Sequence, residues 1–342
     1  MRKGTYQSAG VNLEASEQVK IGIKKLAVNT YGPDVLGGVG GFGAMYKIAG
    51  YEKPVLVSST DPVGTKLMVA GMAGDYSKIG IDLVNACIND VIVVGASPLF
   101  FLDYIATSTM DPEIVETVIA GIVEACSEVN CALIGGETSE MPGVFTRDNF
   151  DISGFVVGIV EEEHMLRPHD NIQAGDVIIG LPSNGLHTNG YSLVRHVFQL
   201  DENPQSLFDH IPELGTTLAQ ALLKPHPSYY DALKPVFCFS KGIAHITGGG
   251  IYENLPRVLP KTLGAVFDSS AWDKPNIFDY IERIGNIETE EMYRVFNMGL
   301  GMVIMCDPAK VEPMLSLIPD SVVVGEIVSG FCESQRITIL NK

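Results

Sequence analysis

The stretch from Pro54 to Leu67, with the sequence PVLVSSTDPVGTKL, constrains the fold more than any other part of this chain. Residues 55–59 form a short apolar-to-polar run, a pattern that favours a buried strand. Four residues that can take part in binding or catalysis follow within six positions: Asp61, Gly64, Thr65 and Lys66. Because loops after strand ends present side chains on a rigid support, we expect Asp61 to hold a divalent cation and Lys66 to contact a phosphate. An ordinary turn is the alternative, since Asp-Pro often begins one.

Length and charge limit the classes of function that the chain can serve. The 342 residues, 46% of them hydrophobic, predict two domains with sizeable cores at about 150 residues per domain. The 23 Lys and Arg against 41 Asp and Glu give a net charge of −18. A surface this acidic repels nucleic acid and anionic membranes, so we expect neither as a partner. It would also repel a phosphorylated ligand unless a metal or local positive charge reverses the field.

Cysteine usage and hydropathy predict a reduced, cytoplasmic protein. None of the six cysteines forms a CxxC pair or a cluster with zinc spacing, so we expect buried, reduced thiols. The N-terminal residues lack the apolar segment of a signal peptide. The most apolar stretch, residues 91–102, is interrupted by Gly95 and Pro98 and is too short to span a bilayer.

A glycine-rich run precedes this strand, with five glycines among residues 37–43. So many glycines cannot hold a regular element without a large entropic cost, which predicts a loop. Such a loop lets backbone N–H groups approach a phosphate closely, although it matches neither the P-loop nor the Rossmann pattern. A flexible loop without a ligand is the alternative.

Residues 79–94 predict a helix with an unusual polar face. Asp82, Asn85 and Asn89 share the face opposite the apolar stripe, and Asp90 lies about 100° further round. The face carries acids and amides but no lysine, arginine or glutamate, which favours metal and ribose contacts over a solvated surface.

Two further acids occur in or after predicted strands. Asp103 interrupts the strand predicted for residues 99–107, and it could be either a core acid or a site acid. Glu137 follows the strand predicted for residues 131–134 and two glycines, so it is a candidate metal ligand, with turn chemistry as the alternative. Asp111-Pro112 is a typical helix start, and the helix that follows has a broad apolar face and is structural.

Strands and helices alternate in the second half, which predicts an α/β layer. His187 lies in the loop at 183–190, between a predicted strand and a predicted helix, where it could hold an anion or move a proton. A surface histidine is the alternative. Gly248 to Gly250 precede another predicted helix, so their N–H groups could bind a phosphate, with a simple turn as the alternative.

Taken together, these segments resemble the phosphoribosylformylglycinamidine cyclo-ligases, also called aminoimidazole ribonucleotide synthetases. The resemblance spans nearly the whole chain and rests on motifs that include GGVGGFGA at 37–44, GGETSEMPG at 135–143, GLHTNGYSLVR at 185–195 and EMYRVFNMGLGM at 291–302. Superfamily relatives, among them thiamine-monophosphate kinase, share the acids and glycines but differ in the second half. One departure is Pro62, where the family usually has glycine, because proline fixes φ near −65° and removes an N–H.

The resemblance implies an α/β (α+β) fold in two domains. The first, residues 1–168, is a mixed α/β domain that binds ATP and whose strands form a barrel across a homodimer. The second, residues 169–342, is an α/β domain. The implied reaction is ATP-dependent ring closure of a small ribonucleotide, formylglycinamidine ribonucleotide, with Mg²⁺ and K⁺ as the expected ions. A sibling small-molecule kinase and a non-enzymatic nucleotide-binding scaffold are the alternatives.

The motifs and the resemblance together assign the expected site residues. The metal ligands are Asp61, Asp90 and Glu137, and the catalytic residues are His187, Asp90 and Lys66. The substrate is expected at Asn189, Gly248, Gly249 and Gly250. Residues expected to contact ATP lie in the glycine run, in the loop after the first strand and on the polar helix face: Gly37, Gly38, Gly40, Gly41, Asp61, Gly64, Thr65, Lys66, Asp82, Asn85 and Asn89.

Overall fold

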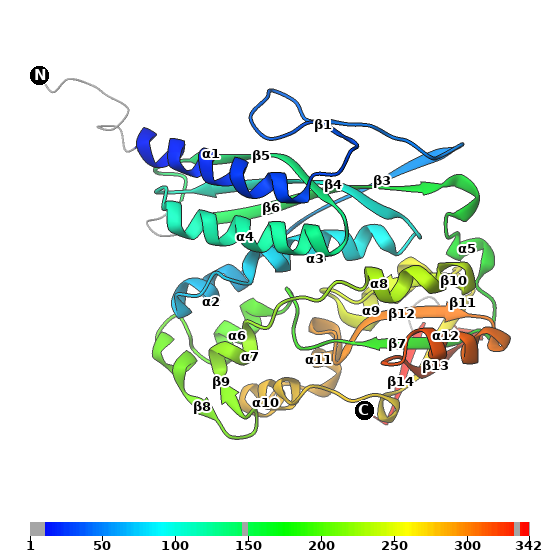
Figure 1. Cartoon of the computed structure of the whole chain (residues 1–342). Coiled ribbons are helices and arrows are strands. Elements are labelled where there is room, and N and C mark those ends of the chain that lie inside the picture. The colour runs from blue at the N-terminus through cyan, green and yellow to red at the C-terminus, as the bar shows by residue number, and fades with distance from the viewer. Residues whose placement is uncertain (1–10, 146–149, 332–335, 342) are drawn as a thin grey trace, which may run out of the picture. The chain divides into compact units, whose positions relative to one another are not determined.

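The structure, a computed structural model, describes residues 11–145, 150–331 and 336–341 (Figure 1). The chain divides into two compact units. The first comprises residues 1–91 and 97–161, and the second comprises residues 92–96 and 162–342. Each unit combines a sheet with helices, which confirms the expected mixed α/β class.

An open four-stranded sheet in the order β3-β6-β4-β5 forms the centre of the first unit. The pairs β3–β6 and β6–β4 are antiparallel, whereas β4–β5 is parallel. No sheet formed by the described residues closes on itself, so the barrel expected across two chains is not present within this one. The strands of this unit, including a separate β1–β2 hairpin, are β1 (Val35–Gly37), β2 (Met45–Tyr46), β3 (Pro54–Pro62), β4 (Ser97–Thr107), β5 (Ala132–Glu140) and β6 (Phe150–Glu161).

Helices accompany this sheet, and α1 and α4 lie side by side (Figure 1). Asp111 caps α4 by accepting hydrogen bonds from the N–H groups of Glu113 and Ile114, 3.0 and 3.4 Å away, and Pro112 takes the first helical position. The predicted start of this helix is therefore confirmed. The helices are α1 (Leu13–Ala27), the 3-10 turn η2 (Val28–Thr30), α2 (Lys66–Ala73), α3 (Ile79–Ile92) and α4 (Pro112–Glu128).

Two strands extend beyond the residues predicted for them. β3 pairs with β6 from Pro54 to Pro62, and β5 pairs with β4 as far as Glu140. Asp61 and Glu137 therefore lie within strands rather than after them, which corrects the prediction. The ladder continues past the apolar residues because backbone pairing depends on the neighbouring strand as well as on side-chain hydrophobicity. Pro62 is tolerated because it ends an edge strand.

A six-stranded sheet in the order β10-β12-β7-β13-β11-β14 organises the second unit, with all pairs antiparallel except β11–β14. Sequence reasoning did not assign β11, whose partners β13 and β14 both come later in the chain. The strands, including a small β8–β9 hairpin, are β7 (Val177–Pro182), β8 (His210–Ile211), β9 (Thr216–Thr217), β10 (Ser240–His245), β11 (Leu263–Asp268), β12 (Leu300–Cys306), β13 (Val322–Ser329) and β14 (Ile337–Leu340).

Short helices connect these strands, which confirms the predicted alternation. Their α-helices are α5 (Pro168–Asn171), α6 (Tyr191–Val197), α7 (Leu218–Leu222), α8 (Tyr230–Leu233), α9 (Gly250–Asn254), α10 (Asn276–Gly285), α11 (Thr289–Val295) and α12 (Val311–Leu317). The described part of this unit also contains six 3-10 helices: η3 (Glu162–His164), η4 (Pro204–Phe208), η5 (Lys234–Phe239), η6 (Leu255–Arg257), η7 (Ser269–Ala271) and η8 (Pro308–Lys310). Every residue of β12 is buried, as expected for a strand paired on both sides. Within the described residues, no helix combines the length and the hydropathy needed to cross a membrane.

Candidate functional site

A row of two acids and two glycines crosses the sheet of the first unit. Asp61 of β3 and Asp103 of β4 both pair with Gly154 of β6, and Asp103 also pairs with Gly136 of β5. Directly paired residues share one face of a sheet, so both carboxylates lie on the same face. The two glycines leave the backbone between the acids without side chains.

Asp103 is the residue that sequence reasoning left undecided, and the structure gives it an unusual environment. Its side chain is 5% exposed, and its Oδ2 atom has no hydrogen-bond partner among the described residues. A Cβ atom at Gly136 would lie 2.3 Å from Asp103 Oδ1, so the carboxylate rests over bare backbone. Burial, with a smaller contribution from Glu137, raises the pKa of the Asp103 carboxyl to about 7.

Asp103 lines a cavity of about 480 Å³ in the first unit, together with the glycine run. The loop contributes Gly40 and Gly41, and α1 contributes Lys20 and Lys24. Glu17 of α1 also lines the cavity, so two ammonium groups face one exposed carboxylate and the buried Asp103. The two ammonium groups and a backbone without side chains can accept an anionic ligand despite the negative charge of the chain. Sequence reasoning did not select the two lysines, although their spacing of i, i+4 places them on one helix face.

Individual glycines of this run have different roles. The Val39 N–H donates to Tyr31 Oη at 2.9 Å, and a Cβ atom at Gly38 would lie 2.0 Å from the same oxygen. Gly40 has φ of +114°, which side chains rarely tolerate, and no atom lies within 4 Å of the place of its missing Cβ. Gly38 is thus needed for packing, whereas Gly40 is needed for backbone shape and leaves open space. Gly37, at the end of β1, lies beside Met45 of β2.

The polar face of α3 is buried, which excludes the alternative that it is a solvated face, while its predicted contacts with ATP stay a prediction. Asp82, Asn85 and Asn89 are each no more than 1% exposed. Lys66 at the start of α2 is also fully buried, and its Nζ lies 2.8 Å from Asp82 Oδ2 and 2.9 Å from Oδ1. Burial lowers the pKa of Lys66, and Asp82 opposes this shift. A contact between Lys66 and a phosphate would therefore require this ion pair to open.

The structure brings together two of the three predicted metal ligands. Cys87 of α3 donates its Sγ–H to the Asp61 carbonyl at 3.8 Å, so Asp90, three residues further along α3, and Asp61 belong to one neighbourhood. Burial, followed by the charges of Asp61 and Asp90, raises the pKa of the Cys87 thiol. Ser59 Oγ donates to Asp90 Oδ2 at 3.2 Å, which ties α3 to β3. Glu137 pairs with Tyr104 and lies on the other face of the sheet, where it is exposed. Among the described residues, the three carboxylates therefore do not form a single cluster.

Gly64 and Thr65 lie in the exposed loop between β3 and α2. Gly64 has φ of +72°, and Thr65 precedes the first residue of α2 without a capping bond from its side chain. Gly64 thus supplies the positive φ of this loop, while Pro62 is still paired with Ser153 at the end of β3.

In the second unit, His187 is 1% exposed, which corrects the alternative that it is a surface histidine. Its backbone has φ of +60°, and its ring stacks on His226 with centroids 4.1 Å apart. The loop is fixed by Asn297, whose Nδ2 donates to the Gly185 carbonyl at 2.8 Å and whose Oδ1 accepts from Ser183 Oγ at 2.7 Å.

The predicted substrate residues of the second unit do come together. A Cβ atom at Gly248 would lie 3.1 Å from Asn189 Oδ1, so the two loops meet. However, Gly250 is enclosed, because a Cβ there would lie 1.9 Å from the Tyr293 carbonyl oxygen. The Glu253 side chain lies beside Gly249, where its carboxylate would oppose a bound phosphate. Gly248 is the exposed member of the three.

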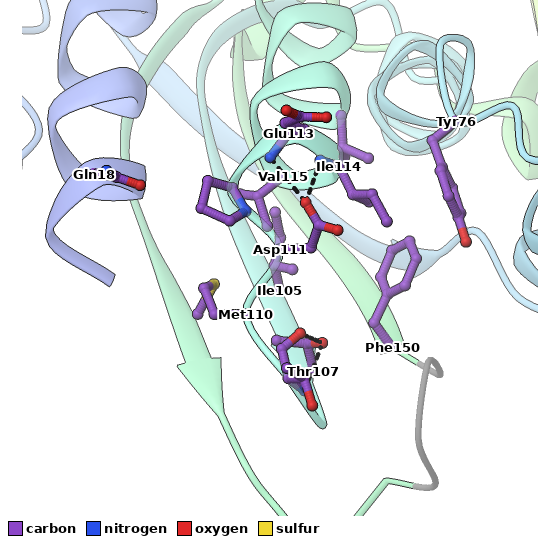
Figure 2. Close-up of a pocket in the computed structure, with 13 residues that line it drawn as sticks. Gln18, Tyr76, Ile105, Thr107, Met110, Asp111, Glu113, Ile114, Val115 and Phe150 are labelled. Carbon is purple, nitrogen blue, oxygen red and sulfur yellow. Dashed lines mark hydrogen bonds between the residues drawn. The ribbon is translucent and has the colours of Figure 1, made fainter. Parts of the chain in front are cut away.

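A larger cavity, about 770 Å³, lies at the N-terminal end of α4 (Figure 2). Phe150 and Tyr76 flank it, and Asp111 uses its Oδ1 atom to cap the helix. None of the described residues that line this cavity is a lysine or arginine. Its lining therefore suits a phosphorylated ligand less well than the cavity beneath the glycine run.

Comparison with known proteins identifies the class and then the family. AIR synthase related protein, N-terminal domain, matches residues 42–160, and AIR synthase related protein, C-terminal domain, matches residues 173–334. The two units thus have the architecture of AIR synthase related proteins. A phosphoribosylformylglycinamidine cyclo-ligase from Caldanaerobacter subterraneus is 48% identical over 95% of this chain and 98% of its own. One from Geobacillus thermodenitrificans is 45% identical over 95% and 96%. The chain belongs to the phosphoribosylformylglycinamidine cyclo-ligase family, which confirms the resemblance seen in the motifs.

Solved structures share the fold at low sequence identity. A thiamine-monophosphate kinase from Stenotrophomonas maltophilia has a TM-score of 0.68 and 16% identity, with 93% of this chain and 95% of that chain covered. The hydrogenase maturation protein HypE in complex with ATP has a TM-score of 0.64 and 15% identity, with 92% and 88% covered.

Proposed function

We propose that this chain catalyses the ATP-dependent ring closure of formylglycinamidine ribonucleotide to 5-aminoimidazole ribonucleotide in purine biosynthesis. The observation that carries the proposal is the 44–48% identity, over nearly full length, to relatives named for this cyclo-ligase activity. The two matched family domains cover most of the chain and support the same assignment.

The chemistry requires activation of a poor leaving group. The formyl oxygen attacks the γ-phosphorus of ATP, the bond to ADP breaks, and the oxygen becomes part of a phosphate ester. The amidine-side nitrogen then attacks the formyl carbon, the ring closes, and inorganic phosphate leaves. Positioning and neutralisation of phosphate charge supply most of the rate enhancement in phosphoryl transfer, so the protein needs cationic groups and backbone donors at the ATP site.

The cavity beneath the glycine run is our proposed site for the ATP phosphates. Lys20 and Lys24 bring positive charge to it, and Gly40 and Gly41 allow close backbone approach. A buried Asp103 with a raised pKa repels a polyphosphate less than an ionised acid would. HypE in complex with ATP and a thiamine-monophosphate kinase complexed with AMPPCP and TMP share the fold, which supports a nucleotide site in this architecture. This unit is accordingly the proposed ATP-binding domain.

Asp61 and Asp90 are the proposed ligands for Mg²⁺. Both are oxygen donors of the kind that magnesium prefers, and both lie around Cys87 on one face of the sheet. Bound Mg²⁺ would neutralise phosphate charge, with K⁺ as the proposed monovalent ion. Glu137, on the other face, would bind only a second metal ion or a ligand that extends around the sheet edge.

Asp90→Ala should lower ATP turnover at least about a thousandfold with the fold intact, because removal of a metal ligand removes charge neutralisation from the transition state. Near-normal turnover would exclude Asp90 from the metal site.

Asn189 and Gly248 are the proposed contacts for the ribonucleotide, since they belong to two loops that meet in the second unit. Gly249 and Gly250 are proposed to give the phosphate-binding loop its backbone conformation without contacting the phosphate themselves. His187 remains a predicted catalytic residue, and its burial means that it would act on the substrate only after a local rearrangement.

A homodimer is also proposed, because the sheet of the first unit has an exposed apolar face and an unpaired edge. Leu56, Tyr104 and Phe155 lie on the same face and are 56%, 40% and 39% exposed. β3 is an edge strand, and such edges are typically covered in native proteins. The molar mass from light scattering should be that of two chains, and Leu56→Glu should shift it toward one. A monomeric wild-type protein would contradict the proposal.

The deciding experiment measures ATP hydrolysis with Mg²⁺ and K⁺, with and without formylglycinamidine ribonucleotide, while aminoimidazole ribonucleotide is assayed. Equal amounts of ADP and aminoimidazole ribonucleotide would establish the reaction. ADP with a phosphorylated, unclosed product would favour a sibling kinase. Neither product from folded protein would favour a scaffold role. A cytoplasmic location is proposed from the nature of the substrates and is tested by cell fractionation.

A further inference from the structure

Three buried histidines of the second unit come together at one edge of its sheet. His245 is the last residue of β10, and His187 lies in the loop that follows β7. Both strands are antiparallel to β12, which lies between them, so their carboxyl ends point to the same edge. His226 joins them from the segment between α7 and α8.

The ring nitrogens have the spacing of a metal site. One nitrogen from each of the three histidines lies within 4.8 Å of the other two, and His226 Nε2 is 3.2 Å from His245 Nε2. Zinc–nitrogen bonds of about 2.0 Å at tetrahedral angles require nitrogens about 3.3 Å apart. One pair is therefore already at the ligand spacing, and the third nitrogen is at most about 1.5 Å too far, which small side-chain rotations can close.

All three histidines are buried. The side chains of His187, His226 and His245 are 1%, 0% and 7% exposed. A metal ion shared by the three rings would replace the water contacts that burial has removed from them. Imidazole nitrogen is a common metal ligand in proteins, so a buried group of three rings is suited to hold one ion.

The backbone around the cluster is held firmly enough to pre-organise it. His226 lies between Pro225 and Pro227, and Asn184 Nδ2 donates to the Pro225 carbonyl at 2.8 Å. Tyr229 Oη donates to the Pro182 carbonyl at 2.8 Å, which ties the same segment to the end of β7. Gly301 of β12 makes room, since a Cβ atom there would lie 1.8 Å from Tyr229 Oη and 3.0 Å from His187 Cε1.

We propose that His187, His226 and His245 bind one Zn²⁺ ion per chain. Imidazole nitrogens suit zinc, and three histidines leave its fourth position for water or another small ligand. Such an ion would fix the loop at 183–190 against the end of β10, and while it is bound His187 would hold the ion and would not act as an acid or base. It is distinct from the proposed magnesium site, which has oxygen donors and lies in the other unit.

The test uses untagged, full-length protein from which metal has been removed by chelator dialysis. Zn²⁺ is titrated in competition with a chromophoric chelator, and Co²⁺ is titrated while its visible absorption is recorded. We expect one equivalent of Zn²⁺ and the intense visible bands of tetrahedral Co²⁺. His226→Leu should weaken Zn²⁺ binding by at least about a hundredfold and abolish the bands, because it removes one of three ligands. His210→Leu, which alters an exposed histidine of the same unit, should bind as the wild type does.

Two further measurements separate loss of zinc binding from loss of folding. Circular dichroism of metal-free wild type and His226→Leu tests that the variant folds, and His245→Asn replaces it if it does not. X-ray absorption of the zinc-loaded wild type needs no variant and should give three imidazole nitrogens. Wild type that binds no stoichiometric Zn²⁺, equal binding by His226→Leu, or a shell containing sulfur would overturn the proposal. In the first case, His226 and His245 are only a hydrogen-bonded pair of rings.

Discussion

The two glycine runs of this chain look alike in sequence but differ in structure. Around Gly40 and Gly43 nothing lies within 4 Å of the missing Cβ atoms, and the run borders a cavity with two lysines. At Gly250 a Cβ atom would lie only 1.9 Å from a carbonyl oxygen, and Gly249 has a glutamate beside it. Glycine permits close approach by any group, so the same signal marks a space left for a ligand in one unit and a packed chain in the other.

The largest expected effect on stability comes from adding a side chain to the packed glycine run at 248–250. Gly250→Ala should lower the free energy of unfolding by about 2 to 5 kcal/mol, because positive φ and overpacking each add a cost. The measurement is urea unfolding. Gly248→Ala, in which the nearest atom is a side-chain oxygen 3.1 Å away, is the matched control and should cost much less. Equal stability of the two variants would mean that the second run is as open as the first.

The next largest effect tests the acid beside the open run. The folded pKa of Asp103 is raised to about 7, whereas its ordinary value is 3.8. The folded state therefore holds a proton that the unfolded state has lost between these values, so wild-type stability falls as pH rises from about 4 to 7. Relative to wild type, Asp103→Asn should gain stability over this range, by an upper bound of about 4 kcal/mol at pH 8.

Unfolding of Asp103→Asn and wild type at pH 4, 6 and 8 measures this gain. Asp151→Asn, which alters an exposed acid of the same sheet, is the control and should show no comparable trend. A stability difference that does not change with pH would show that Asp103 is ionised in the folded protein, and the cavity would then be a poor site for a polyphosphate.

The sequence predicted the helices and strands better than it predicted the environment of their side chains. Hydrophobic periodicity located α3 and α4, and the cap residues of α4 fixed its start. Periodicity also grouped Asp82, Asn85 and Asn89 on one face, but it could not tell that this face is buried. That outcome depends on Lys66, a partner 16 residues from Asp82 in the chain.

A site residue could be predicted only where the residues that surround it in the fold are also close to it in the sequence. The neighbours of Asp103 come from α1 and the glycine run, far before it, and from β5, well after it, so its pKa could not be read from LFFLDYIAT. His226 lies in a Pro-His-Pro segment without periodicity, and only the fold brings it to His187 and His245. The metal ligands Asp61, Asp90 and Glu137 remain predictions, of which the structure groups the first two.

A smaller effect distinguishes two adjacent lysines of α1. Lys24 lines the cavity beneath the glycine run, whereas its neighbour Lys25 does not. Lys24→Ala should raise the KM for ATP about tenfold, which corresponds to the loss of one contact of about 1.4 kcal/mol. Lys25→Ala removes the same charge from the same helix and should change the KM little. Equal effects from both variants would mean that Lys24 contributes only the general positive charge of the helix. No effect from either variant would mean that the ATP phosphates do not bind in this cavity.

The smallest expected change, that of Gly43→Ala, is compared with the backbone strain expected from Gly40→Ala in the same glycine run. Gly40 has φ of +114°, whereas Gly43 has no positive φ, and neither would meet a neighbour if a Cβ atom were added. Gly40→Ala should therefore cost about 1 to 2 kcal/mol of stability through strain alone. Gly43→Ala should stabilise the protein by about 0.4 to 1 kcal/mol, because it restricts the unfolded chain without straining the folded one. If Gly43→Ala leaves stability intact but raises the KM for ATP, the space at Gly43 is used by the nucleotide. If both the stability and the KM are unaffected, the ligand contact of this run is confined to the glycines that line the cavity, Gly40 and Gly41.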